Sequence, residues 1–181
     1  ALEYAQLQCG DVEVRMGDNP LLKTLSCSFC GLTSLDLSGC PSLESLNCYH
    51  NNLTSLDLSS CPNLTKLYCD DNNLASLDVS DCSELGTLSC ALDNLTSLNV
   101  SGCLSLKFLN CNRNCLTSLD LSGCPNLEIL CCGNNDLTSL DISGCPSLRD
   151  LSCTYNRISD TSALEAWVAE SGHTGSVNPQ K

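Results

Sequence analysis

The sequence predicts a solenoid, a fold in which short repeated units stack along one axis. Three observations lead to this expectation: a strict 21-residue period, columns of leucine and cysteine that follow it, and an asparagine column in the same register. A regular period is the mark of a repeat architecture, because each unit can bury its apolar face only against its neighbours. The 181 residues therefore form one short repeat array.

The cysteines show the period most plainly. Thirteen of the 17 recur every 21 residues in two columns, Cys27, Cys48, Cys69, Cys90, Cys111, Cys132 and Cys153, and Cys40, Cys61, Cys82, Cys103, Cys124 and Cys145. Disulfide frameworks instead use even sets at irregular spacings. Zinc would need convergent pairs of ligands, which this spacing does not provide. We expect the column thiols to be reduced and buried as small hydrophobic side chains.

Four cysteines lie outside the two columns. Cys9 and Cys30 are near the N-terminal end, and whether they pair is left open by the sequence. Cys131 takes a strand position that should face outward, and Cys115 takes a turn position. We expect these last two to be the accessible thiols.

Each unit is predicted to contain a short strand, a turn and a return segment. The unit Leu43 to Asn63 follows the pattern L-x-x-L-x-C-x-x-N-x-L-T-S-L-D-L-S-G-C-P-x, with Ser60 in place of the glycine. The alternation Leu46-Asn47-Cys48 indicates a strand with one apolar face. The asparagine after it suits a bend whose open backbone groups its side chain can bond. The Ser-rich second half is too short for a helix of several turns, so we expect an extended or single-turn return.

The asparagine column and the three leucine columns complete the repeat. The asparagines are Asn51, Asn72, Asn114, Asn135 and Asn156, with Cys30 and Asp93 in the two remaining places. These residues resemble the leucine-rich repeat, L-x-x-L-x-L-x-x-N-x-L, with cysteine at its third apolar position, over seven repeats in residues 22–158. The narrower resemblance is to the cysteine-ladder repeats of bacterial internalin J-like surface proteins, from which the second cysteine column departs.

The resemblance implies a right-handed, curved β-solenoid with a parallel sheet on its concave face. Extended or short 3-10 segments would form the convex face, and the concave face would bind partners. A chain of this kind needs closed ends, because the outermost repeats expose core residues.

Both ends of the chain are predicted to cap the array. Residues 1–21 read as a degenerate capping repeat, and residues 159–173 as a short capping helix. The helix is indicated by a capping-box pattern from Ser162 to Glu165 and by an apolar stripe. We expect residues 174–181 to be a flexible tail.

Charge and hydropathy narrow the choice of partners. The chain has 8 basic and 21 acidic residues, a net charge of −13, and lacks an apolar run of the length that spans a membrane. We therefore expect no nucleic-acid partner and no membrane insertion. We also expect no metal or other cofactor, because the Asp column offers one carboxylate per repeat whereas calcium needs a cage of oxygens. The chain is expected to be monomeric.

A candidate protein-binding patch can be read from the non-repeating positions of the predicted concave face. Five of the seven aromatic residues lie there, although packing does not require them. The candidate site comprises Phe29, Tyr49, His50, Tyr68, Lys66, Phe108, Arg113 and Tyr155. The alternative is sequence drift on a solvated sheet face, where aromatic residues are also favoured.

These observations predict a non-enzymatic protein-recognition or adhesion module of a secreted or cell-surface bacterial protein. Only two histidines are present, and the spacing brings no nucleophile to either of them. Two alternatives are a structural spacer in a larger surface protein and the repeat domain of a cytoplasmic effector. Reduced thiols would suit the cytosol as well.

Overall fold

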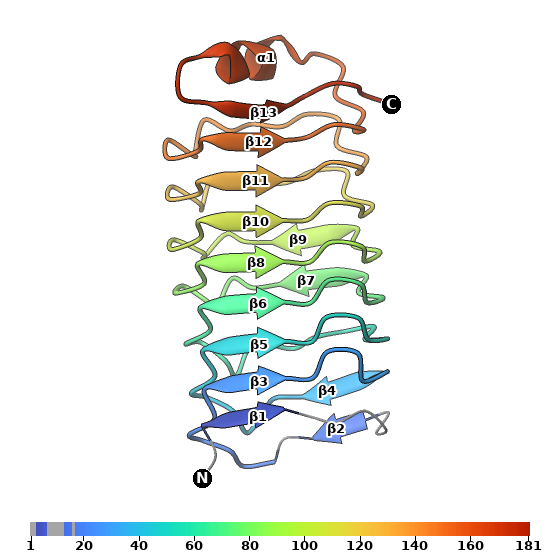
Figure 1. The fold of residues 1–181 in the computed structure, drawn as a ribbon, viewed down its shortest axis with the longest axis vertical. Helices are drawn as coiled ribbons and strands as arrows, with labels where there is room; N and C mark the ends of the chain where they lie inside the picture. Colours follow the sequence, from blue (N-terminus) through green and yellow to red (C-terminus); the bar gives the residue numbers. More distant parts are fainter. Residues whose placement is uncertain (1–2, 7–12, 16) are drawn as a thin grey trace.

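The protein is a β-solenoid in which nine parallel strands form one continuous sheet (Figure 1). The computed structural model describes residues 3–6, 13–15 and 17–181. The strands of this sheet, in spatial order, are β1 (Tyr4–Gln6), β3 (Thr24–Ser26), β5 (Ser45–Asn47), β6 (Lys66–Tyr68), β8 (Thr87–Ser89), β10 (Phe108–Asn110), β11 (Ile129–Cys131), β12 (Asp150–Ser152) and β13 (Thr174–Ser176). The predicted repeat solenoid with a parallel sheet is confirmed.

The register of the sheet reproduces the sequence period. Leu46, Leu67, Leu88 and Leu109 are paired in succession across β5, β6, β8 and β10. Each strand has three residues, and in most strands the central leucine is buried while its two neighbours are more exposed. The 21-residue repeat thus places equivalent residues side by side on adjacent strands.

The side of the solenoid opposite the large sheet is made of extended return segments. Two pairs of them form two-stranded parallel sheets, β2 (Glu13–Arg15) with β4 (Ser34–Asp36) and β7 (Ser76–Asp78) with β9 (Ser97–Asn99) (Figure 1). The described return segments contain no 3-10 helix. Of the two forms that the sequence allowed for these segments, the structure has the extended one.

The Asp column stabilises the turns of these return segments. Asp57 Oδ1 accepts the backbone N–H of Ser59 at 3.0 Å, and the same bond recurs from Ser122 to Asp120 at 2.9 Å. These bonds lower the pKa of both carboxyls from its usual value. The column therefore acts in turn bonding.

The core is a stack of leucine and cysteine side chains between the two sides. Both cysteine columns are buried, all but one of their members completely, and each member is a free thiol. Burial raises the pKa of Cys27 and Cys61 to about 12 and that of Cys69 well above its usual value. Because the thiolate is the reactive form, we expect these thiols to be unreactive in the folded protein.

A thiol count should separate the column cysteines from Cys115 and Cys131, two of the four cysteines outside the columns. In the native protein, a thiol reagent should react quickly with Cys115, which is exposed, and slowly with Cys131, which is half-buried. The thirteen column thiols should react only after unfolding without reductant. Cys115→Ser should remove the fast phase alone. Rapid native reaction of many thiols would contradict the buried, reduced columns.

The asparagine column forms a buried ladder along one edge of the core. Asn51 Oδ1 accepts the N–H of Leu32 at 2.9 Å, and its Nδ2 donates to the carbonyls of Cys27 and Cys48 at 2.9 and 2.8 Å. Equivalent bonds recur at Asn72, Asn114, Asn135 and Asn156. Each asparagine therefore joins its own repeat to the preceding one, which confirms the bonding role predicted for this position.

The C-terminal helix is shorter than the predicted segment and is started differently. Helix α1 spans Ser162–Ala169, with Leu164 buried and Trp167 and Val168 packed against the core. The expected capping box does not form, because the helix begins after Thr161 and Ser162 bonds the side chain of Asp160. Thr161 Oγ1 instead donates to Glu165 Oε1 at 2.6 Å.

The expectation of a flexible tail over residues 174–181 is corrected by the structure. Thr174–Ser176 form β13, the ninth strand of the sheet, and Val177 is buried. Gln180 then extends the asparagine ladder, since its Oε1 accepts the N–H of Ile158 at 3.3 Å and its Nε2 donates to the carbonyl of Cys153 at 3.1 Å. The last repeat leaves backbone groups open, and this segment satisfies them.

At the N-terminal end, β1 and β2 continue both sides of the array. Tyr4–Gln6 pair with β3, and Glu13–Arg15 pair with β4, as equivalent strands of neighbouring repeats do. Cys9 lies outside the described residues, and so does its possible pairing with Cys30.

Candidate protein-binding face

The outer surface of the large sheet, here called the sheet face, displays the first and third residues of each strand. The three-residue strands alternate, so the central leucine enters the core and its neighbours point outward. Of the candidate residues, Lys66 and Tyr68 lie on β6 and Phe108 lies on β10. Tyr68 pairs with Ser89 of β8, and Phe108 pairs with Thr87 of the same strand. Small side chains therefore separate the two aromatic residues on this face.

The remaining candidates lie in the turns that follow the strands, a placement that the sequence did not indicate. Phe29, His50, Arg113 and Tyr155 occupy the same turn position, three residues after the strand ends, and Tyr49 directly precedes His50. All seven residues at this position have a left-handed backbone with φ between 54° and 60°: Phe29, His50, Asp71, Leu92, Arg113, Asn134 and Tyr155. We call this set the turn column.

The left-handed conformation recurs at this one position in all seven repeats, whichever residue occupies it. Residues other than glycine and asparagine adopt it at a cost, and the rest of the turn must compensate for that cost. In five of the seven repeats the turn is held by the ladder asparagine that comes next in sequence. The turn column lies along the edge of the sheet face at which the strands end.

An aromatic cluster occupies the N-terminal part of this edge. The ring of Phe29 meets the ring of Tyr49 edge-on, with centroids 5.1 Å apart, and lies 4.7 Å from the ring of His50. His50 Nδ1 also contacts Asp71 Oδ2, so His50 lies between Phe29 and Asp71. Edge-to-face contacts of this kind hold exposed rings in a fixed arrangement.

A shallow hollow of about 390 Å³ adjoins the cluster. Amide, carboxylate, imidazole and phenyl groups line it, from Phe29, Gly31, His50, Asn51, Asn52, Asp71, Asn72 and Asn73. Exposed aromatic rings beside polar groups of this kind are typical of recognition surfaces.

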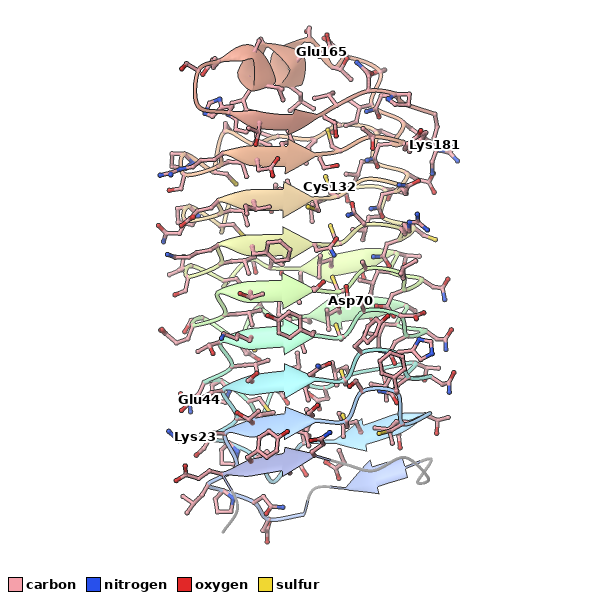
Figure 2. All side chains as sticks on the ribbon, viewed as in Figure 1. Lys23, Glu44, Asp70, Cys132, Glu165 and Lys181 are labelled. Carbon is pink, nitrogen blue, oxygen red and sulfur yellow. The ribbon has the colours of Figure 1, made fainter. Side chains whose placement is uncertain are left out.

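The middle of the sheet face is held by a network of side chains. Asn110 Nδ2 donates to Ser89 Oγ at 3.1 Å, and that hydroxyl donates to Asp70 Oδ1 at 2.5 Å. The same carboxylate oxygen accepts the N–H of Ala91 at 3.0 Å. Figure 2 shows Asp70 at the carboxyl end of its strand. Because Asp70, Ser89 and Asn110 belong to three successive repeats, the network joins these repeats to one another.

The charges on this side are partly paired between neighbouring repeats. Lys23 Nζ lies 3.0 Å from Glu44 Oε1, at the strand-entry edge seen in Figure 2, and Lys107 Nζ lies 3.4 Å from Glu128 Oε1. Within the described part of the chain, Lys66 and Arg113 form no ion pair. These two cations are available to a partner.

The described residues hold no cluster of three or more His, Cys, Asp or Glu side chains that could bind a metal ion. In the same part of the chain, no helix has the length and apolar character needed to cross a membrane.

The repeat pattern matches a known family profile, described as leucine-rich repeats in two copies, at residues 20–60, 41–81, 104–142 and 125–166. These matches cover more than half of the chain. The chain belongs to the leucine-rich repeat family. No curated protein sequence matches it.

Three solved structures illustrate what this leucine-rich repeat chain is similar to. The functional domain of InlJ from Listeria monocytogenes, which includes a cysteine ladder, is 27% identical over 96% of this chain and 49% of its own, with a TM-score of 0.52. The LRR protein LIC12759 from Leptospira interrogans is 28% identical over 76% of this chain and 38% of its own, with a TM-score of 0.71. TLR13 in its complex with ssRNA13 is 26% identical over 76% of this chain and 23% of its own, with a TM-score of 0.66. The chain thus spans about half or less of each of these relatives.

Proposed function

We propose that this protein is a non-enzymatic recognition module that binds a protein partner through the sheet face and the adjoining turn column. The observation that carries the proposal is the exposure of aromatic side chains on this one side. Phe29 is 57%, Tyr68 37% and Tyr155 48% exposed, although each could have been a small polar residue without loss to the core. Tyrosine and other aromatic residues dominate the binding energy of protein interfaces.

The composition of this side supports a protein partner over a nucleic acid. TLR13 was solved with an RNA, so the leucine-rich repeat fold accommodates that class of ligand. This chain, however, has a net charge of −13, and phosphate neutralisation requires clustered basic residues. Lys66 and Arg113 lie two repeats apart, with acidic residues between them. They therefore suit individual salt bridges in an interface that contains both polar and apolar contacts.

We further propose that the protein is a secreted or surface-exposed bacterial protein, as its resemblance to cysteine-ladder repeats implies, and that it acts in adhesion as a monomer. A spacer in a larger surface protein and a repeat domain of a cytoplasmic effector are the competing functions. A spacer would not need the exposed aromatic side chains, and this difference makes the proposal testable.

The test compares capture of partners by the wild-type protein and two double variants. Tyr68→Ala with Phe108→Ala removes the aromatic residues of the sheet face, and Phe29→Ala with His50→Ala removes part of the turn column. We expect either pair to weaken binding by about tenfold or more, since interface aromatics are frequently hot spots. Partners captured from host-cell and bacterial-surface extracts would be quantified by mass spectrometry, and the binding constant measured for the strongest.

The matched control is Leu104→Ala. Leu104 is also a large apolar residue, 57% exposed, but it lies in a turn that precedes a strand, at the other edge of the sheet. This variant should capture the same partners as the wild-type protein. Unchanged capture by both double variants would reject the proposed site and favour the spacer.

A further inference from the structure

Asp93 occupies a place in the buried ladder that asparagine holds in five of the other repeats. Its Oδ1 accepts the N–H of Asn72 at 3.1 Å and that of Leu74 at 3.2 Å. These are the bonds that Asn51 Oδ1 accepts from Cys30 and Leu32, at 3.1 and 2.9 Å. The carboxyl of Asp93 is therefore oriented like the amides of the other rungs.

The second carboxyl oxygen lacks the partners that the amide nitrogen has elsewhere. In Asn72 and Asn114, Nδ2 donates to the carbonyl three residues before it and to the equivalent carbonyl of the preceding repeat. By the same register, Oδ2 of Asp93 faces the carbonyls of Cys90 and Cys69. This oxygen is buried and has no hydrogen-bond partner, and Asp93 as a whole is 6% exposed.

An ionised carboxylate in this position would set a negative oxygen against two carbonyl oxygens. A carboxylate accepts hydrogen bonds and donates none, whereas the protonated acid has one O–H to donate. We propose that Asp93 is held as a neutral carboxylic acid whose Oδ2–H donates to the carbonyl of Cys90 or Cys69, so that a bound proton completes the ladder at the fourth repeat.

The surroundings of Asp93 act in the same direction. Burial raises the pKa of Asp93 to about 7, against the lowering effect of the two N–H groups on Oδ1, and the carboxylates of Asp70 and Asp71 raise it further. The other titratable groups that face it are the thiols of Cys48, Cys69 and Cys90, whose own raised pKa values keep them neutral. Asp71 is in turn paired with His50.

The sign of the pH effect follows from the two states of the chain. The ordinary pKa of an aspartate, about 3.9, applies to the unfolded chain. The folded chain holds the proton up to about pH 7, so its stabilising contribution is complete below about pH 4 and is lost as pH rises towards 7. Loss of the proton weakens the turn that carries Ala91 and its bond to Asp70, in the middle of the candidate binding face.

Asp93→Asn tests this inference in the full chain. Between about pH 4 and 7, the unfolding equilibrium constant of the wild-type protein should rise by up to about tenfold per pH unit relative to that of the variant. At pH 8 the variant should be the more stable protein, by at least about a hundredfold in this constant. The carboxylic-acid C=O band of the folded wild-type protein at pH 5.5 should be absent from the variant's infrared spectrum.

Asn114→Asp is the matched control, because it places a second acid in the next rung of the ladder. It should add a pH dependence of the same sign. An equal pH dependence of stability in the wild-type protein and Asp93→Asn would overturn the proposal. So would stabilisation of the wild-type protein at pH 5.5 by calcium or sodium that Asp93→Asn abolishes, since a cation would then fill the place assigned to the proton. The decision rests on Asp93→Asn, whose new side chain already fits this place in other repeats.

Discussion

Asn135→Ala should lower the free energy of unfolding by about 2–4 kcal/mol, a large effect for a single polar side chain. Asn135 is completely buried, its Oδ1 accepts the N–H of Leu116 at 3.0 Å, and its Nδ2 donates to the carbonyls of Cys111 and Cys132 at 2.9 and 3.1 Å. Alanine would leave the N–H without an acceptor. It would remove one of the two asparagine donors of each carbonyl, because Cys111 keeps its bond from Asn114 and Cys132 its bond from Asn156. It would also leave a space of the size of an amide group, for which the core has no replacement.

The measurement is urea unfolding followed by circular dichroism, with the midpoint compared between variants. Asn52→Ala is the control, because Asn52 is exposed and makes a single bond of 3.4 Å to the carbonyl of Gly31. Its effect should stay within about 0.5 kcal/mol. Similar shifts for the two variants would show that the ladder bonds do not contribute as the structure indicates.

Deletion of residues 174–181 should lower the free energy of unfolding by about 4 kcal/mol and the melting temperature by about 8–16 °C. The deletion exposes the core beneath Val177 and removes the bonds of Gln180 to Ile158 and Cys153. It also removes the bond from Lys181 Nζ to the carbonyl of Asn135, 2.7 Å long, at the edge where Figure 2 labels Lys181. Strand β12 would become an open edge, which favours association between chains.

Calorimetry and light scattering would measure both consequences. Gln180→Ala is the companion variant and should cost about 1–2 kcal/mol without opening the edge of the sheet. If the truncated protein has the melting temperature of the full chain and stays monodisperse, residues 174–181 would be a flexible tail, as the sequence suggested.

The repeating part of the fold could be predicted from the sequence because the same residue types recur at the same positions of each repeat. The columns of Leu46, Cys48 and Asn51 each mark a fixed role, namely strand core, second core position and buried turn bond. Seven copies make the register unambiguous, since a shift by one residue would expose every leucine.

The ends and the turn column could not be predicted in the same way. Gln180 takes the ladder role from a different residue type and at a different spacing, so no column contains it. Its polar neighbours resemble those of a disordered tail. The left-handed turn was equally hidden, because residues as different as Phe29, Leu92 and Arg113 adopt it. Asp71 and Asn134 are the members whose short polar side chains could have signalled it.

That the candidate residues bind a partner stays a prediction, and the sequence indicated their placement only in part. Tyr68 and Phe108 lie on strands as expected, whereas Phe29 and His50 lie in turns. The network of Asp70, Ser89 and Asn110 was missed, because serine and asparagine on a strand carry no sequence signal of their hydrogen-bond partners.

The direction of the backbone hydrogen bonds has a mechanical consequence. The bonds between repeats run along the stacking axis, as in the pairs from Cys48 to Tyr68 and from Cys69 to Ser89. A force that pulls the two ends apart would act on the hydrogen bonds of one repeat at a time. The array should therefore unfold by detaching repeats one after another from an end. Each 21-residue repeat that detaches would lengthen the chain by about 65–70 Å. A molecule stretched between two surfaces would then extend in even steps and keep its remaining repeats intact.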